Sequence, residues 1–70
     1  MKKLQKQLTK KGYNVALSVD GIEVYDLIDD DYILIELSTN GYIYLISENA
    51  SMQVDNNLKS ILEGLTDFAK

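Results

Sequence analysis

This 70-residue sequence contains no cysteine, histidine, arginine, proline or tryptophan. The lack of cysteine excludes disulfide bonds and thiolate metal sites, and the lack of histidine removes the commonest metal ligand and general base. No apolar run approaches the roughly 20 residues of a membrane-spanning helix. These absences favour a domain that is stabilised by its apolar core and that works without a cofactor or a metal.

Charge is unevenly distributed along the chain. The formal net charge is −4, the seven basic residues are all lysines, and the eleven acidic residues all lie from Asp20 onward. Five of the lysines lie near the start: Lys2, Lys3, Lys6, Lys10 and Lys11. The sequence that follows these lysines is strongly acidic, which argues against direct nucleic-acid binding and favours a protein partner with a basic surface. Membrane binding is not expected either, because the basic first segment carries only Leu4 and Leu8 as apolar anchors.

A chain of this length predicts a single domain spanning residues 1–70. The polar start, MKKLQKQLTKK, does not resemble a signal peptide, and we expect a cytoplasmic protein.

Short-range patterns predict the secondary structure. Residues 1 to about 11 indicate a short helix that ends at Gly12. Alternating apolar residues predict four strands, from Tyr13 to Val19, from Ile22 onward, from Tyr32 to Leu37 and from Tyr42 to Ser47. Turns are predicted between them at Asp20-Gly21, at Asp29-Asp30-Asp31 and at Thr39-Asn40-Gly41.

The apolar spacing becomes helical near the end of the chain. From about Ser51 to Ala69 an amphipathic stripe comprises Val54, Leu58, Ile61, Leu62, Leu65 and Phe68. Gly64 interrupts this helix and predicts its close approach to the sheet. The predicted fold is α+β, a four-stranded antiparallel meander with an N-terminal and a C-terminal helix packed on one face (α-β-β-β-β-α).

The alternation assigns side chains to the two faces of the sheet. The residues expected to point inward are Val15, Leu17, Val19, Ile22, Val24, Ile33, Ile35 and Leu37. Those expected to point outward are Ser18, Glu23, Tyr25, Tyr32, Leu34 and Glu36. Tyrosine is common at interfaces because it supplies rigid area and a polar tip, although tyrosine pairs also stiffen exposed sheets. The presence of Leu34 on the outward face, together with either Tyr42 or Tyr44, indicates that a partner covers this face.

Three adjacent aspartates form the most distinctive polar feature. Asp29, Asp30 and Asp31 indicate a solvated turn or an acidic tip that contacts a partner, and they lack the ligand offsets of a calcium loop. Glu23 and Glu36 are a conceivable acid–base pair, but nothing else in so short a chain indicates an enzyme. We therefore expect a protein-binding site formed by Glu23, Tyr25, Asp29, Asp30, Asp31, Tyr32 and Glu36, with no catalytic or metal-ligating residues.

The order of several segments resembles that of a known family. A short helix, KGYNVALS, ILIELS, the turn TNG, YIYLISEN and the helix VDNNLKSILEGL are similar to small acidic phage type II-A anti-CRISPR proteins. The resemblance implies a DNA mimic whose carboxylates occupy the motif-reading pocket of a CRISPR nuclease. It maps that role onto the Asp29–Asp31 turn and Glu48. The hairpin around Asp20-Gly21 is a departure from the family.

Two functions remain as hypotheses. The first is an acidic inhibitor or modulator, encoded by a phage or mobile element, that blocks a basic nucleic-acid enzyme. The alternative is a self-associating structural or antitoxin/immunity-type module that forms a homodimer through its tyrosines. Binding in the first case is expected to weaken with salt, and in the second to respond little. A third reading, small-ligand binding in a pocket under the C-terminal helix, has no support in the sequence beyond the predicted fold.

Overall fold

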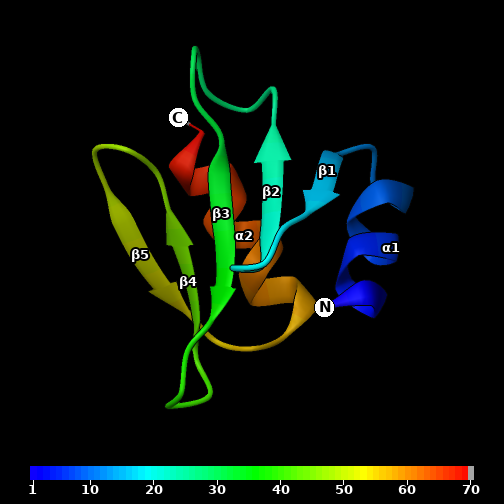
Figure 1. The fold of residues 1–70 in the computed structure, drawn as a ribbon, viewed down its shortest axis with the longest axis vertical. Coiled ribbons are helices and arrows are strands. Elements are labelled where there is room, and N and C mark those ends of the chain that lie inside the picture. Colours follow the sequence, from blue (N-terminus) through cyan, green and yellow to red (C-terminus); the bar gives the residue numbers. More distant parts are fainter. Residues whose placement is uncertain (70) are drawn as a thin grey trace.

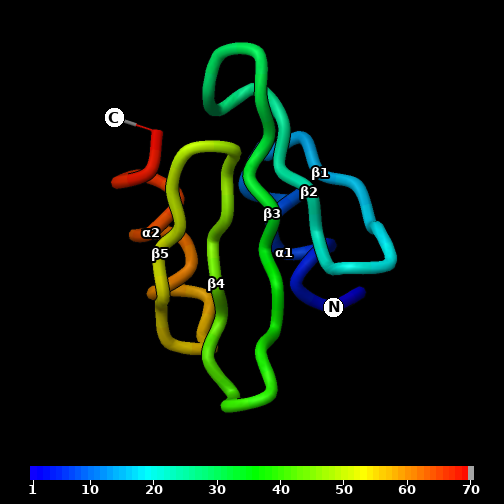
Figure 2. The backbone as a smooth tube through the Cα atoms, turned by 60° about the vertical axis from the view of Figure 1, so that its left-hand side comes forward, coloured from blue at the N-terminus to red at the C-terminus, as the bar shows by residue number. Residues whose placement is uncertain are grey.

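The computed structural model describes residues 1–69. In this part of the chain the helices are α1 (Lys2–Lys10) and α2 (Leu58–Phe68), and the strands are β1 (Asn14–Leu17), β2 (Ile22–Tyr25), β3 (Ile33–Leu37), β4 (Ile43–Ile46) and β5 (Ser51–Val54). The strands form one antiparallel sheet in the order β1-β2-β3-β4-β5. Both helices pack on the same face of the sheet (Figure 1, Figure 2). The predicted α+β class and the pairing of the third and fourth strands are confirmed.

The prediction of four strands is wrong, because β5 lies where the sequence predicts the start of the C-terminal helix. This strand pairs with β4 along its whole length. Because side chains alternate along a strand, Met52 and Val54 point to the same face of β5, and both pack against the core. The helix begins only at Leu58, since Asn57 has extended dihedral angles and its side-chain oxygen accepts a hydrogen bond from the Ser60 amide at 2.8 Å.

The core lies between the sheet and the two helices. Its fully buried side chains come from the inner positions of the three central strands and from both helices: Leu8, Ile22, Val24, Ile33, Ile35, Ile43, Leu45, Ile61 and Leu65. Within residues 1–69 no polar or charged side chain is buried. Burying an aliphatic side chain contributes about 1.5–3 kcal/mol, so apolar burial is the main source of stability.

Three residues that the alternation assigns to the core lie outside it. Val19 is fully exposed, and Leu17 and Leu37 are 42% and 51% exposed. Val19 belongs to the β1–β2 turn, because Ser18 and Gly21 pair through two backbone hydrogen bonds of 2.8 and 3.4 Å. The predicted Asp-Gly hairpin is therefore present, but its two-residue loop starts one position earlier, at Val19. Leu37 ends β3, beside a hollow that the helices leave open.

Two glycines allow close approach of the backbone. A Cβ atom at Gly21 would lie 2.0 Å from the carbonyl oxygen of Ile35 in β3. At Gly64 a Cβ would lie 2.7 Å from Leu45 Cδ1 and 2.9 Å from Val54 Cγ1. The expected close approach of α2 to the sheet at Gly64 is thus confirmed. The obstacle at Gly21 is strand backbone, which cannot shift without disturbing the sheet.

Gly21→Ala is expected to destabilise the protein far more than Gly41→Ala. Both glycines have a positive φ, +152° and +87°, in sparsely populated regions that cost an alanine about 1–3 kcal/mol. A Cβ at Gly41 meets no atom within 4 Å, whereas one at Gly21 overlaps the backbone of β3. Urea denaturation measures the free energy of unfolding of each variant. Equal losses of stability would contradict the close packing of Gly21 against β3.

Candidate functional site

We call the sheet surface turned away from α1 and α2 the outer face; in Figure 1 it is turned toward the viewer, with α2 behind the strands. Strand register arranges its side chains in cross-strand rows. One row contains Ala16, Glu23, Leu34, Ile46 and Ser51. A neighbouring row contains Glu36, Tyr44 and Gln53. The rings of Tyr25 and Tyr32 lie together at the end of the face next to the β2–β3 loop.

The outer face is acidic, and no strand within residues 1–69 carries a lysine. The lysines of this part of the chain are all exposed and lie on α1, at its end, or on α2: Lys2, Lys3, Lys6, Lys10, Lys11 and Lys59. Glu23 and Glu36, by contrast, are half-buried on β2 and β3. Because Glu23 pairs with Leu34, Glu36 is the diagonal neighbour of Glu23 across the two strands. The Cα atoms of the two glutamates are about 7–8 Å apart in this arrangement. The two negative charges share one small surface.

Tyrosines hold part of this acidic surface in place. The Tyr25 hydroxyl donates a hydrogen bond to the Glu23 carboxylate. The Tyr25 ring contacts that of Tyr32, with ring centroids 5.6 Å apart and planes inclined by 42°. The hydrogen bond to Glu23, then partial burial, and then the negative charge of Glu23 raise the pKa of Tyr25 above its ordinary value. The hydroxyl therefore remains a donor across the neutral pH range.

The three aspartates of the β2–β3 loop have different surroundings. Asp29 and Asp30 are exposed. The two carboxylate oxygens of Asp31 accept hydrogen bonds from the backbone amides of Tyr32, at 2.7 Å, and of Glu48, at 3.0 Å. Asp31 thereby joins the β2–β3 loop to the β4–β5 turn. Its carboxylate has an internal structural role, which leaves Asp29 and Asp30 as the exposed acids of the predicted cluster.

The structure brings four of the predicted site residues, Glu23, Tyr25, Tyr32 and Glu36, onto one face, with the aspartates at its end. Sequence reasoning did not place Tyr44, because its strand is apolar on both faces and alternation alone does not orient it. The pairing of Tyr44 with Glu36 assigns it to the outer face. Its hydroxyl donates a hydrogen bond to the side-chain oxygen of Gln53 at 3.0 Å. Strand register is therefore the information that completes the site.

A hollow of about 360 Å³ lies where the outer face meets the β2–β3 loop and the β4–β5 turn. It is lined by Asp31, Tyr32, Leu34, Ile46, Ser47 and Glu48. The lining combines the apolar side chains of Leu34 and Ile46 with two acidic residues. Such a surface fits a side chain that has an apolar stem and a cationic end.

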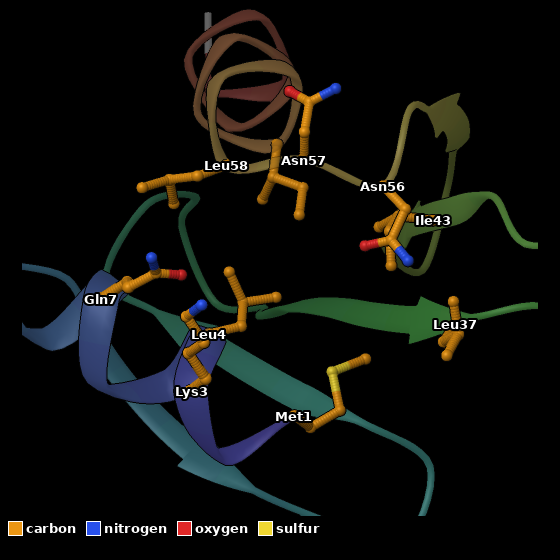
Figure 3. Close-up of a pocket in the computed structure, with 10 residues that line it drawn as sticks. Met1, Lys3, Leu4, Gln7, Leu37, Ile43, Asn56, Asn57 and Leu58 are labelled. Atoms are coloured by element: carbon orange, nitrogen blue, oxygen red, sulfur yellow. The ribbon is translucent and has the colours of Figure 1, made fainter.

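A second hollow, of about 400 Å³, lies on the helical side of the sheet (Figure 3). It is lined by Met1, Lys3, Leu4, Gln7, Leu37, Ile43, Asn56, Asn57, Leu58 and Ile61. Leu4 of α1 and Leu58 of α2 approach it from opposite sides (Figure 3). Lys3 is its only charged side chain, so this lining contains no carboxylate that could act as a general acid or base.

Two absences hold for residues 1–69. No three acidic side chains in this range gather closely enough to hold a metal ion. Among the helices that the structure describes, none has the length and apolar character required to cross a membrane. The outer face itself presents carboxylates, phenols, the amide of Gln53 and apolar side chains.

Comparison with known proteins identifies no relative. No protein-family model matches the chain, and neither a curated protein nor a solved structure does. The resemblance to anti-CRISPR inhibitors therefore stays a prediction. What the protein does has to be inferred from the outer face itself.

Tyr25 is expected to ionise at a higher pH than the ordinary value of about 10. Because its folded-state pKa is raised, the stability that Tyr25 contributes is fully present below pH about 10 and is lost as pH rises through the folded-state pKa. Glu23→Ala removes both the acceptor and the charge, and should lower this pKa. Absorbance titration of tyrosinate, with Tyr25→Phe subtracted to isolate the signal, measures it. An unchanged pKa in Glu23→Ala would show that Glu23 is not the cause.

Asp31→Asn is expected to destabilise the protein by about 1 kcal/mol or more, because the amide can accept only one of the two backbone hydrogen bonds and carries no charge. Asp29→Asn removes the same charge from an exposed site and should change stability by less than about 0.5 kcal/mol. Thermal and urea denaturation of the two variants provide the comparison. Identical stabilities would exclude a structural role for the Asp31 carboxylate.

Proposed function

We propose that this protein is a small binding domain whose outer face docks on a basic surface of another protein and thereby inhibits or modulates that protein. The observation that carries the proposal is the composition of the outer face. It presents tyrosines and half-buried carboxylates, while the lysines of residues 1–69 all lie on or next to the helices. A face of this kind complements a positively charged partner.

The shape and residue types of the outer face suit a protein rather than a small molecule. Tyr25, Tyr32 and Tyr44 supply large side chains with few rotatable bonds, so little conformational entropy is lost on contact. Leu34 and Ile46 are half-buried between them and offer apolar area at the centre. Polar groups around an apolar centre are the usual composition of a protein interface.

Charge also favours a different protein over a second copy of this one. Two outer faces in contact would bring together two surfaces that each carry Glu23 and Glu36. No lysine on a strand within residues 1–69 could offset that repulsion. A basic partner is instead attracted over a long range, which accelerates association. The surface thus supports the inhibitor hypothesis better than self-association.

A narrower form of the proposal makes the partner a nucleic-acid enzyme, such as a CRISPR nuclease, that this protein blocks by imitating DNA. Its support is the resemblance in segment order and the exposed Asp29 and Asp30 at the end of the outer face. A groove lined by basic residues accepts carboxylates as it accepts phosphates. The same resemblance is the reason to propose an origin in a phage or mobile element.

The test is affinity capture at low salt with the tagged protein, followed by stepwise elution with NaCl. The wild type is compared with Glu23→Gln/Glu36→Gln on the outer face and with Asp55→Asn/Glu63→Gln, which removes the same charge from exposed positions outside it. We expect a basic protein that elutes at moderate salt, that the outer-face variant fails to capture and that the control variant retains. If the narrower proposal holds, added duplex DNA should release the captured partner from the tagged protein.

Two outcomes would contradict the proposal. In the first, the outer-face variant captures the partner as well as the wild type does, which would place the binding site elsewhere. In the second, size-exclusion chromatography shows a concentration-dependent dimer that Tyr32→Ala disrupts and that salt leaves unchanged. That result would favour the self-associating module.

A further inference from the structure

The outer face combines, at its end next to the β2–β3 loop, an aromatic pair with a carboxylate that is already oriented. Tyr25 and Tyr32 form the pair, with ring centroids 5.6 Å apart. The Tyr25 hydroxyl donates to the Glu23 carboxylate and so restricts its position. An ionised carboxylate has about four lone-pair positions, so Glu23 can accept further hydrogen bonds after binding Tyr25.

A second carboxylate lies beside the first. Glu36 is the diagonal neighbour of Glu23 across β2 and β3, and the side chain of Leu34, which is paired with Glu23, lies on the same face. On the other side of Glu36, Tyr44 is its partner in β4. A cation between the two glutamates would therefore meet two carboxylates and apolar or aromatic side chains within one small area.

We propose that this part of the outer face selects arginine over lysine in the partner protein, with one guanidinium group bound by Glu23 and Glu36 beside the ring of Tyr44. The inference rests on the proposed function, since the arginine belongs to the basic partner that the outer face docks on. It adds the side-chain chemistry that the face recognises.

The chemistry of the two cations explains the selection. The planar guanidinium donates hydrogen bonds in a fixed fork, so it can bind a carboxylate through two bonds and still donate to a second one. It also stacks on aromatic rings and is less strongly hydrated than an ammonium group. Lysine offers a compact, strongly hydrated charge. The difference should be largest where carboxylates and tyrosine rings lie together, as they do at Glu23 with Tyr25 and at Glu36 with Tyr44.

The apolar residues on the same face suit the stem of an arginine side chain. Leu34 and Ile46 are cross-strand neighbours and both are half-buried. They extend from Glu23 toward β5 in one row of side chains. An aliphatic stem can lie on this row while its guanidinium end reaches the glutamates.

The experiment uses two peptides that are identical except that one has four arginines where the other has four lysines. Each is titrated into the isotope-labelled full chain at one fixed, low salt concentration, and backbone amide shifts are followed by NMR. We expect the arginine peptide to bind about tenfold more tightly, with the largest shifts in β2 and β3. The spectrum of each variant also reports whether it is folded.

Four variants test which residues cause the preference for arginine. Glu23→Gln and Glu36→Gln should each weaken the arginine peptide more than the lysine peptide, and so reduce the ratio of the two affinities. Glu63→Gln removes the same charge from an exposed position on α2 and should leave the ratio unchanged. Tyr25→Phe keeps the ring but frees the Glu23 carboxylate, and an intermediate ratio is expected.

The outcomes separate the two proposals. If both peptides shift the outer face and bind equally well, arginine selection is wrong, while docking on basic partners stands. The same conclusion follows if the preference persists in the Glu23→Gln/Glu36→Gln double variant. If neither peptide shifts residues of the outer face, the proposed function fails together with the inference.

Discussion

One-sided burial of the sheet is the constraint on which the rest of the structure depends. Residues 1–69 have no buried polar network, and cysteine is absent from the chain. Stability therefore depends on the inner positions of β2, β3 and β4 and on Leu8, Ile61 and Leu65 of the helices. Because side chains alternate along a strand, only every second residue has to be apolar to form the core. The residues between them can be polar or charged. The outer face can hold carboxylates at little cost to the core.

α1, which covers part of the core, also separates most of the lysines from the outer face. α1 presents its lysines to solvent while Leu8 packs inward, whereas Glu23 and Glu36 lie on the strands and Asp29 and Asp30 are exposed in the β2–β3 loop. The basic helix α1 thus lies on the helical side of the sheet, and the outer face carries carboxylates and no lysine within residues 1–69. Because of this separation, the electrostatic potential at the outer face is more negative than the net charge of −4 alone indicates. It is the physical basis for a basic partner.

Local patterns were sufficient for most of the fold because they depend on neighbouring residues. The turns at Asp29–Asp31 and at Asn40, and both helices, follow from spacings of a few positions. β5 was missed because it has only four residues and because Val54 fits the apolar stripe of the following helix as well as the alternation of a strand. Val19 was misplaced because a one-residue shift of the turn removes it from β1. In each case two local patterns were compatible with the residues, and sheet pairing selected one.

The sequence by itself determined the α+β class, the apolar inner face, the acidic character of the chain and the outward direction of Glu23, Tyr25 and Glu36, because these follow from composition and from a spacing of two. Only the tertiary structure decided which of these residues are neighbours. Asp31 accepts a hydrogen bond from the amide of Glu48, 17 positions away, and Glu36 lies beside Glu23 through strand register. Such contacts depend on how distant segments align, and alignment is set by the packing of the whole sheet against its helices.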